Sequence, residues 1–263
     1  MAFYTRQRRR FPIRLILAAG IILFSVMRYF SHTEENPWTG RKQHITLNPD
    51  QEIQLGLQSA PQMAQQFGGL YPDQELQSAV KQIGEKLVQH SIAADTPYQY
   101  NFYLLRDPNT VNAFALPGGQ VFITYGLLKL LENEDQLAGV LGHEIGHVVG
   151  RHSAERIAKQ NLTQGIIQGV LVGSSDYSAA QTATMIGNLI NMKYGREDEL
   201  ESDKLGVFIM ADAGYDPEQM IGVMNILKQA AGGRRVPEFQ STHPNPENRI
   251  EHIRRAIEEY RNR

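Results

Sequence analysis

The chain has 263 residues, of which 41% are hydrophobic and 21% charged, a composition ordinary for a folded globular protein. Its formal net charge of −2 gives no general electrostatic attraction to nucleic acid, so we expect no nucleic-acid partner. Because the chain has no cysteine, any zinc site must use nitrogen and oxygen ligands, which suits a catalytic site better than a closed structural one.

The N-terminal thirty residues carry a membrane signal. A cluster of arginines precedes an uncharged run from Leu15 to Met27. The stretch 11–30 reaches the ~20 residues that a membrane span needs if Arg14 and Arg28 extend to the interface. No small-x-small cleavage site follows, which favours an uncleaved anchor over a cleaved signal peptide, the alternative left open. By the positive-inside rule, the chain after this segment should lie on the extracytoplasmic (periplasmic) side.

The composition divides the chain into three expected parts. Residues 1–30 form the membrane anchor or signal segment, residues 31–47 a polar linker rich in turn formers, and residues 48–263 one domain. The sequence Asn48-Pro49-Asp50 is typical of a helix start, and Pro61 should kink or end that helix.

A helix and a small sheet are expected next. The apolar stripe between Asp73 and Gln89 predicts the helix. Tyr98–Leu105 alternates aromatic and polar residues, which is typical of a strand. The segments Val111–Leu116 and Gln120–Tyr125 flank the turn formers Pro117-Gly118-Gly119 and predict a hairpin.

The next helix, expected from Asn133 through His152, contains the motif HEIGH. On a helix His143 and His147 lie one turn apart on one side, where both rings can bind a single Zn²⁺. Glu144 lies ~100° round the helix, where it can act as a base on a metal-held water without being a ligand. A random chain of this composition would contain His-Glu-x-x-His with a probability of roughly 2%, so the motif needs support from its context.

The remainder of the chain should be mostly helical. Between 154 and 192, Gly165, Gly169 and Gly173 form a small-xxx-small series that favours close helix packing, because the apolar stretch around them is too short to cross a bilayer. Further helices are expected at 196–213, from 216 onward, and from 245 onward.

A catalytic zinc needs a third protein ligand and keeps one position open for water. The acidic helix after residue 196 offers four carboxylates: Glu197, Glu199, Glu201 and Asp203. Spacing alone does not choose among them.

Four motifs in order along the chain carry a resemblance. They are Asn112-Ala-Phe-Ala-Leu-Pro-Gly-Gly119, HEIGH at 143–147, Glu199-x-x-x-Asp203 with Lys204-Leu205-Gly206, and Thr242-His243-Pro244 with Arg249. Together they resemble the zinc metallopeptidase family of the CAAX prenyl protease and the heat-shock protease HtpX, closest to its single-domain OMA-like and β-barrel assembly-enhancing protease branch. The likeness covers roughly residues 50–260. It implies an α+β, mainly helical, gluzincin-like domain with a small sheet beside the active-site helix.

The resemblance also implies roles for individual residues. Glu199 would be the third zinc ligand, with Glu201 the weaker alternative. Asp203 would orient a ligand histidine by accepting its other N–H. His243 would either stabilise the oxyanion or cap the open position of the zinc and hold the enzyme latent, and Arg249 would brace this loop.

An extended substrate needs a strand edge with which to pair. The residues that would supply it are Asn112, Ala113, Phe114 and Ala115. The alternative is an ordinary hairpin. His152, which follows the motif closely, is expected to be structural.

We therefore expect a membrane-anchored endopeptidase that uses one Zn²⁺ to hydrolyse peptide bonds of polypeptide substrates. As the resemblance implies, these substrates would be misfolded membrane or envelope proteins, and the role would be protein quality control. The alternative is a zinc-stabilised chaperone-like or binding protein of the envelope with little proteolysis. Glu144 argues against it, because a purely structural site has no use for a base.

Overall fold

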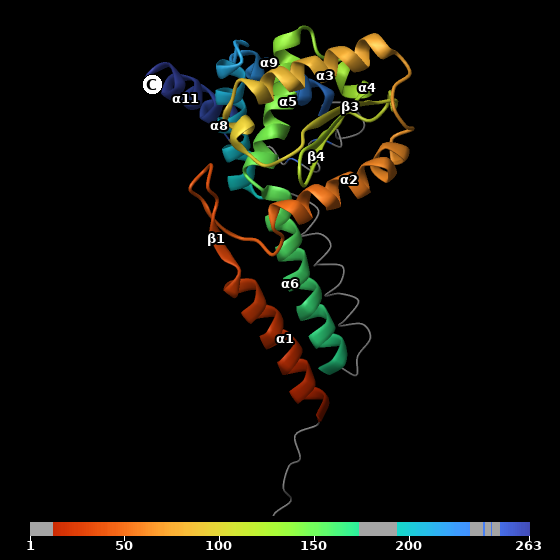
Figure 1. Ribbon diagram of the computed structural model, residues 1–263, viewed down its shortest axis with the longest axis vertical. Helices are drawn as coiled ribbons and strands as arrows, with labels where there is room; N and C mark the ends of the chain where they lie inside the picture. The colour runs from red at the N-terminus through yellow and green to blue at the C-terminus, as the bar shows by residue number, and fades with distance from the viewer. Residues whose placement is uncertain (1–12, 174–193, 232–238, 240–242, 244–247) are drawn as a thin grey trace, which may run out of the picture.

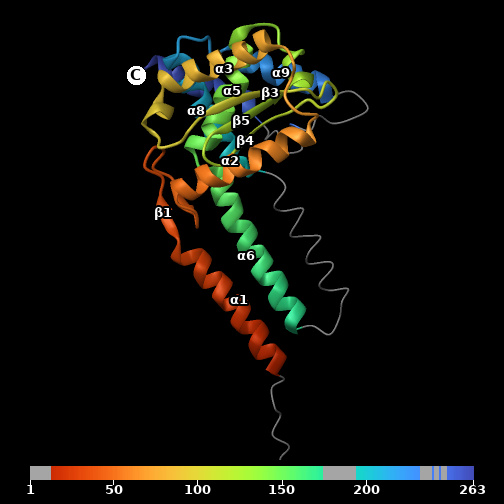
Figure 2. The ribbon, with the colours of Figure 1, turned by 45° about the vertical axis from the view of Figure 1, so that its right-hand side comes forward.

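The computed structural model describes residues 13–173, 194–231, 239, 243 and 248–263. A head built from helices and a small sheet carries two long helices, α1 (Ile13–Ser31) and α6 (His152–Gly173), that extend away from it side by side (Figures 1 and 2). Among the described residues, only α1 is long and apolar enough to cross a membrane.

The mainly helical α+β class expected from the sequence is confirmed. The helices of the head are α2 (Pro49–Gln66), α3 (Gln74–Gln89), α4 (Tyr125–Leu128), α5 (Glu134–Val149), α8 (Arg196–Asp212), α9 (Gln219–Ala231) and α11 (Arg249–Arg261), with a 3₁₀ turn at Ile92–Asp95. The strands are β1 (Thr33–Glu35), β2 (Lys42–His44), β3 (Asn101–Leu105), β4 (Ala113–Leu116) and β5 (Gln120–Thr124).

The main sheet has the strand order β3-β5-β4, with β3 parallel and β4 antiparallel to β5. The hairpin expected from the Pro117-Gly118-Gly119 turn is confirmed. The strand expected from Tyr98, β3, begins at Asn101 because its partner β5 begins at Gln120, opposite Asn101. The Tyr98 side chain is buried and donates to Glu52 on α2. Phe114 on β4 stacks on Phe122 at 4.9 Å, and α2 covers this face of the sheet.

The other face of the sheet packs against α5, the central helix of the head. Every residue from Gln136 to Val149 is buried, because α3, α8, α9 and β4 surround the helix. A helix enclosed in this way must be apolar nearly all round, so its few polar side chains need partners within the protein.

The motif helix is shorter than expected, ending at Val149 rather than His152. Arg151 adopts a left-handed backbone conformation with φ of 55°, which breaks the helix and starts α6 in a new direction. Its guanidinium donates to buried Glu52 on α2 at 2.6 and 2.9 Å and to the Leu47 carbonyl at 2.9 Å. These bonds hold a conformation that arginine rarely adopts.

The α2 helix also differs from its prediction, because it runs through Pro61 to Gln66. A proline inside a helix frees the carbonyl four residues earlier, here that of Leu57. Leu57 is 43% exposed, so water can replace the lost donor and the helix continues.

The segment 31–47, expected to be a linker, contains an ordered hairpin. β1 and β2 pair antiparallel. Asn36 donates to the Val149 carbonyl at 2.9 Å and Gln43 to the Gly150 carbonyl at 2.7 Å. The hairpin thereby satisfies carbonyls at the C-terminal end of the motif helix, which explains why this polar segment is ordered.

The later helices agree with the sequence pattern where they are described. α8 matches its expected range, whereas α9 begins at Gln219, because the chain at 216–218 forms a turn. The expected helix over 174–192, most of the loop 232–242 and the start of the last helix at 245 lie outside the described residues.

Candidate metal centre

Four buried side chains converge where α5 and α8 cross: His143, His147, Glu199 and His243. One nitrogen or oxygen from each lies within 4.8 Å of the corresponding atoms of the others, which suits a shared metal ion. The sequence therefore named all four members of this cluster, although they lie as far as 100 residues apart along the chain.

The donor atoms face one another closely. His143 Nε2 lies 3.1 Å from His147 Nε2. The Glu199 oxygens lie 3.4 Å from His147 Nε2 and 3.6 Å from His143 Nε2. His243 Nδ1 lies 3.3 Å from His143 Nε2 and 3.0 Å from Glu199 Oε1. Two imidazoles and one carboxylate form a ligand set of catalytic zinc sites, and His243 adds a fourth donor.

Glu144 lies beside this cluster without belonging to it. Both of its carboxylate oxygens are buried, and neither has a hydrogen-bond partner among the described residues. The nearest ionisable contact is His243 Nε2, at 3.7 Å from Glu144 Oε1. Buried polar atoms without partners are rare, and here they suit a site that binds a cation and water.

A close approach of α5 and α8 brings Glu199 to the histidines. A Cβ built on Gly146 would lie 2.8 Å from the Ser202 carbonyl oxygen, so any larger residue would push α8 away. Gly206 meets the backbone of His143 in the same way, at 3.0 Å from its nitrogen. These glycines let the two helices approach until the carboxylate of one reaches the imidazoles of the other.

Asp203 and Arg249 hold the ring of His143. Asp203 Oδ1 lies 2.9 Å from His143 Nδ1, so the carboxylate can accept the outer N–H of a ring whose Nε2 faces the cluster. Arg249 donates to both Asp203 oxygens, at 2.6 and 2.8 Å, and its Nη1 lies 3.3 Å from Glu199. Arg249 thus contacts Glu199 of the cluster and its neighbour Asp203, whereas its expected role in bracing the loop that carries His243 stays a prediction.

His152 holds the second ligand histidine, a contact that the sequence did not reveal. Its Nδ1 lies 2.9 Å from His147 Nδ1, and its Nε2 lies 2.8 Å from Glu201 Oε2. Glu201, the alternative third ligand, therefore binds His152 rather than the cluster. The left-handed turn at Arg151 points His152 back toward the motif helix, and sequence spacing contains no sign of such a turn.

Arg41 on the N-terminal hairpin completes this arrangement. It donates to Glu201 at 2.8 Å and pairs with Asp198 at 2.7 Å and Glu155 at 2.5 Å. The hairpin before the main domain is thereby connected to His147 through Glu201 and His152.

Replacing His152 with alanine is expected to weaken metal binding by about 10–100-fold, because the outer nitrogen of His147 loses its partner. Isothermal titration of the metal-free protein with zinc checks this. His90→Ala, which alters an exposed histidine, is the control and should bind zinc like the wild type. Equal affinity in all three proteins would show that His152 does not support the metal.

Burial and neighbouring charges set the protonation of the centre. Burial raises the pKa of Glu144 above its usual range, against the opposing influence of His243 and His143. Burial likewise lowers the pKa of His147 well below its usual value, which favours the neutral ring that binds metals. Burial acts to raise the pKa of Glu199, but His243, His147 and Arg249 outweigh it and hold this carboxyl well below its usual range.

Two aromatic rings enclose the centre and were also missed in the sequence. Tyr194, just before α8, stacks on His147 with ring centres 4.0 Å apart, and its hydroxyl lies 2.9 Å from Ser153 Oγ. Phe239 stacks on His243 at 4.4 Å. Both rings come from segments without regular periodicity, so no pattern marked them.

The expected substrate edge lies at the outer side of the sheet, on β4. The Asn112 carbonyl accepts a hydrogen bond from Thr124 of β5. Because backbone groups of an antiparallel strand face its partner at every second residue, those of Ala113 and Ala115 point away from β5. The carbonyl of Val111, on the same outward side, accepts from the Phe239 N–H at 3.1 Å. The segment that carries His243 thus also contacts one end of this edge.

The family model described as "Peptidase family M48" matches residues 74–257. The chain is 29% identical over 269 residues to the "Beta-barrel assembly-enhancing protease" of Escherichia coli K12, covering 97% of this chain and 54% of the relative. It is 30% identical over 235 residues to the "Mitochondrial metalloendopeptidase OMA1" of Schizosaccharomyces pombe, covering 88% of this chain and 67% of the relative. The chain thus spans about half the length of the bacterial relative.

The family and branch that the sequence motifs indicated are confirmed. The matched residues contain HEIGH, the Glu199-x-x-x-Asp203 pair and His243, which the fold brings together in one buried cluster. The chain belongs to peptidase family M48.

Proposed function

We propose that this chain is a zinc-dependent endopeptidase that hydrolyses peptide bonds of polypeptide substrates. The observation that carries the proposal is the buried set of His143, His147 and Glu199 with Glu144 beside it. A structural site has no use for a base, whereas this arrangement places a carboxylate without a described partner next to the donors.

The chemistry follows from what the side chains can do. A zinc ion held by His143, His147 and Glu199 would supply Lewis acidity toward a water molecule and the substrate carbonyl. Glu144 takes the proton from the attacking water and passes it to the leaving amine. Its pKa, raised above the usual glutamate range, suits a group that must gain as well as lose a proton.

The position of His243 indicates that the enzyme is latent in this conformation. It is fully buried, and its Nδ1 faces the same point as the three ligands. In this position it takes the place that water and substrate need. We therefore infer that the segment with Phe239 and His243 must move away from the centre before a substrate enters, which favours the capping role over stabilisation of an oxyanion.

Replacing His243 with alanine is expected to raise the basal cleavage of an unfolded protein several-fold, because the three remaining ligands still hold the metal and the fourth position opens. Initial cleavage rates of the two proteins, each with its metal content determined, check this. A loss of activity of about 10²-fold or more with the metal retained would instead indicate an oxyanion donor.

Membrane anchoring is proposed from α1. This helix packs along α6, and removal of residues 13–31 as a signal peptide would uncover that face of α6. An uncleaved anchor is therefore favoured, with the head on the extracytoplasmic side as the arginine cluster predicts. The names of the relatives, an assembly-enhancing protease and mitochondrial metalloendopeptidases, support unassembled membrane and envelope proteins as substrates.

The test of the proposed function is cleavage of a permanently unfolded protein by the purified full chain. Cleavage should stop when a zinc chelator removes the metal and should return when one equivalent of zinc is added. Cleavage that withstands complete removal of the metal would refute the proposal. Suppression of aggregation without any cleavage would support the chaperone-like alternative instead.

A further inference from the structure

The two helices that leave the head are in direct contact along their length. A Cβ built on Gly165 of α6 would lie 2.0 Å from Ser25 Oγ of α1, and one on Gly169 would lie 2.4 Å from Ile22 Cγ1. A larger residue at either position would force Ser25 or Ile22 to shift or the two helices to separate. The small-xxx-small series of α6 therefore packs on α1, in an antiparallel orientation (Figure 2).

The contacts give the depth that α6 reaches along α1. Gly173, the last residue of α6, faces Ala18, since its added Cβ would lie 2.9 Å from Ala18 Cβ. Ser25 lies six residues and Ala18 thirteen residues before the outer end of α1 at Ser31. At 1.5 Å per residue, the glycine series therefore runs from ~9 Å to ~20 Å below that end. A bilayer core is ~30 Å thick, so a helix at this depth beside a membrane span lies within hydrocarbon.

The composition of this half of α6 agrees with its depth. Lys159 is the last charged residue before the end of the helix, fourteen residues later. Of the thirteen exposed large hydrophobic side chains in the described residues, eight lie on α1 and two, Ile166 and Leu171, lie here. The polar exceptions, Thr163, Gln164 and Gln168, carry no charge, and such side chains occur in membrane helices where they hydrogen-bond.

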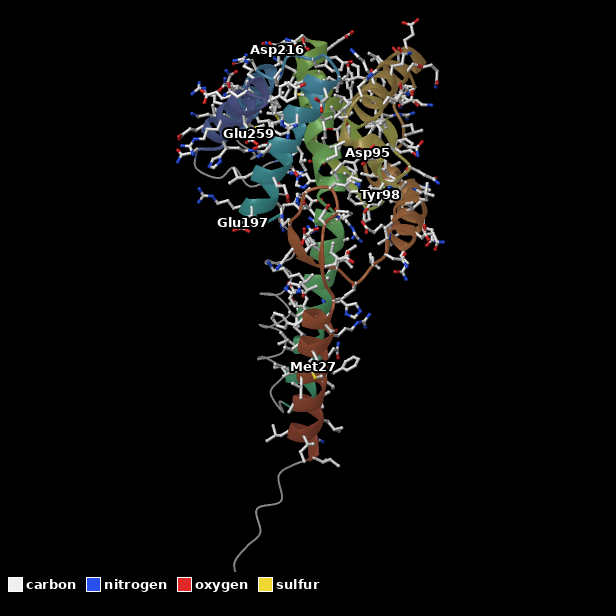
Figure 3. The ribbon with its side chains drawn as sticks, turned by 60° about the vertical axis from the view of Figure 1, so that its left-hand side comes forward. Met27, Asp95, Tyr98, Glu197, Asp216 and Glu259 are labelled. Atoms are coloured by element: carbon white, nitrogen blue, oxygen red, sulfur yellow. The ribbon has the colours of Figure 1, made fainter. Side chains whose placement is uncertain are left out.

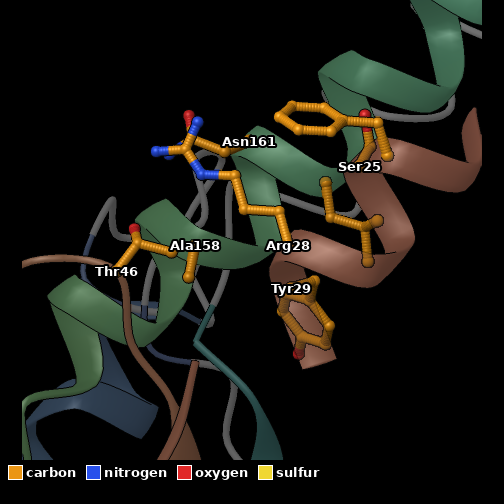
Figure 4. A pocket seen from close by; sticks show the side chains of 8 residues that line it. Ser25, Arg28, Tyr29, Thr46, Ala158 and Asn161 are labelled. Atoms are coloured by element: carbon orange, nitrogen blue, oxygen red, sulfur yellow. The ribbon is translucent and has the colours of Figure 1, made fainter. Parts of the chain in front are cut away.

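A boundary between polar and apolar surface crosses both helices at the same level. A crevice of about 70 Å³ between them is lined by Arg28 and Tyr29 of α1, by Asn161 of α6 and by Thr46, which lies beside α6 (Figure 4). Arginine and tyrosine gather where a helix leaves hydrocarbon for the headgroup layer. The crevice therefore lies at the height expected for the membrane surface.

We propose that residues 162–173 of α6 are embedded in the hydrocarbon of the bilayer beside α1, so that the chain enters the membrane through two helices. This rests on α1 being the membrane anchor of the proposed function. The consequence concerns the metal centre. His152 contacts the ligand His147 and lies nine residues from Asn161, so the centre is held ~14 Å above the membrane surface. Peptide bonds close to the bilayer are then the accessible substrates.

Single cysteines test the proposal, because the natural chain has none. Leu171→Cys probes the embedded half of α6, Leu17→Cys the anchor, and Lys159→Cys the aqueous half of α6. The full chain in sealed membranes is treated with a membrane-impermeant maleimide on the side of the head. The Lys159→Cys variant should react rapidly, whereas the other two should react at least tenfold more slowly until detergent is added.

The outcomes separate the two proposals. Rapid reaction of Leu171→Cys with slow reaction of Leu17→Cys would overturn the embedding of α6 and leave the anchor intact. Rapid reaction of both would refute the anchor itself. A fluorophore on Leu171→Cys distinguishes lipid from protein burial: lipids with quenchers in their acyl chains should quench it, and failure to quench would overturn the proposal.

Discussion

Replacing Glu144 with glutamine is expected to slow the cleavage of an unfolded protein by about 10²–10⁴-fold while the metal stays bound. Glutamine has nearly the same shape but cannot accept a proton from water. Both Glu144 oxygens lack hydrogen-bond partners among the described residues, so the substitution removes no described contact that supports the fold. Initial cleavage rates, with metal content measured on the same samples, give the result.

The matched control for this variant is Glu134→Gln, an exposed residue in the first turn of the same helix. It should cleave at the wild-type rate. Cleavage by the Glu144→Gln variant at that rate would show that another group serves as the base. Loss of the metal from the variant would show that Glu144 acts on metal binding instead.

Replacing Glu199 with glutamine is expected to weaken zinc binding by more than ~100-fold, the largest loss typical of changing a residue that only contacts a ligand. The loss should be larger here because Glu199 is itself a proposed ligand. The amide has no negative charge to offset the ion. Its shape preserves the packing of α8, and Arg249 keeps both bonds to Asp203. Zinc titration of the metal-free variant gives the affinity, and circular dichroism confirms that the helices remain.

Two other acids on α8 serve as comparisons. Glu201→Gln removes the charge beside His152, one contact further from the cluster than His152 itself, so it should weaken zinc binding by no more than the about 10–100-fold effect of an outer partner. Glu197 points outward from α8 (Figure 3), so Glu197→Gln should have no effect. A larger loss from Glu201→Gln than from Glu199→Gln would mean that the third ligand has been assigned to the wrong residue.

The sequence predicted those parts of the site that local geometry determines. The helical repeat alone places His143 and His147 on one side with Glu144 beside them. Glu199 and His243 needed the family likeness, because their positions depend on the crossing of α5 and α8 and on a distant loop. Helices α5 and α8 can approach each other closely because small residues such as Gly146 and Gly206 line their crossing.

The contact of His152 with the outer nitrogen of His147 could not be predicted, because it depends on residues that are distant in sequence. Arg151 adopts its left-handed conformation with the help of Glu52, 99 residues earlier. That turn directs His152 toward His147, and Arg41 in the supposed linker reaches Glu201 beside it. Each residue alone has an ordinary sequence environment, so only the fold reveals the connection.

The small-residue series of α6, Gly165, Gly169 and Gly173, is a second feature that the sequence alone could explain only in part. Its spacing correctly indicated close helix packing, and its short apolar stretch argued against a membrane span. The structure supplies the missing fact, which is that the helix it packs against is α1. A segment too short to cross a bilayer alone can still enter it beside a partner that crosses.

The most direct test of the metal centre is anomalous diffraction at the zinc absorption edge from crystals of the zinc-loaded chain. We expect one strong peak, from a zinc ion bound by His143, His147 and Glu199. His243 should occupy the fourth position around the ion while the enzyme is latent. A zinc ion bound by Glu201 in place of Glu199 would contradict the proposed metal centre. So would the absence of a peak between His143 and His147 in crystals that contain zinc.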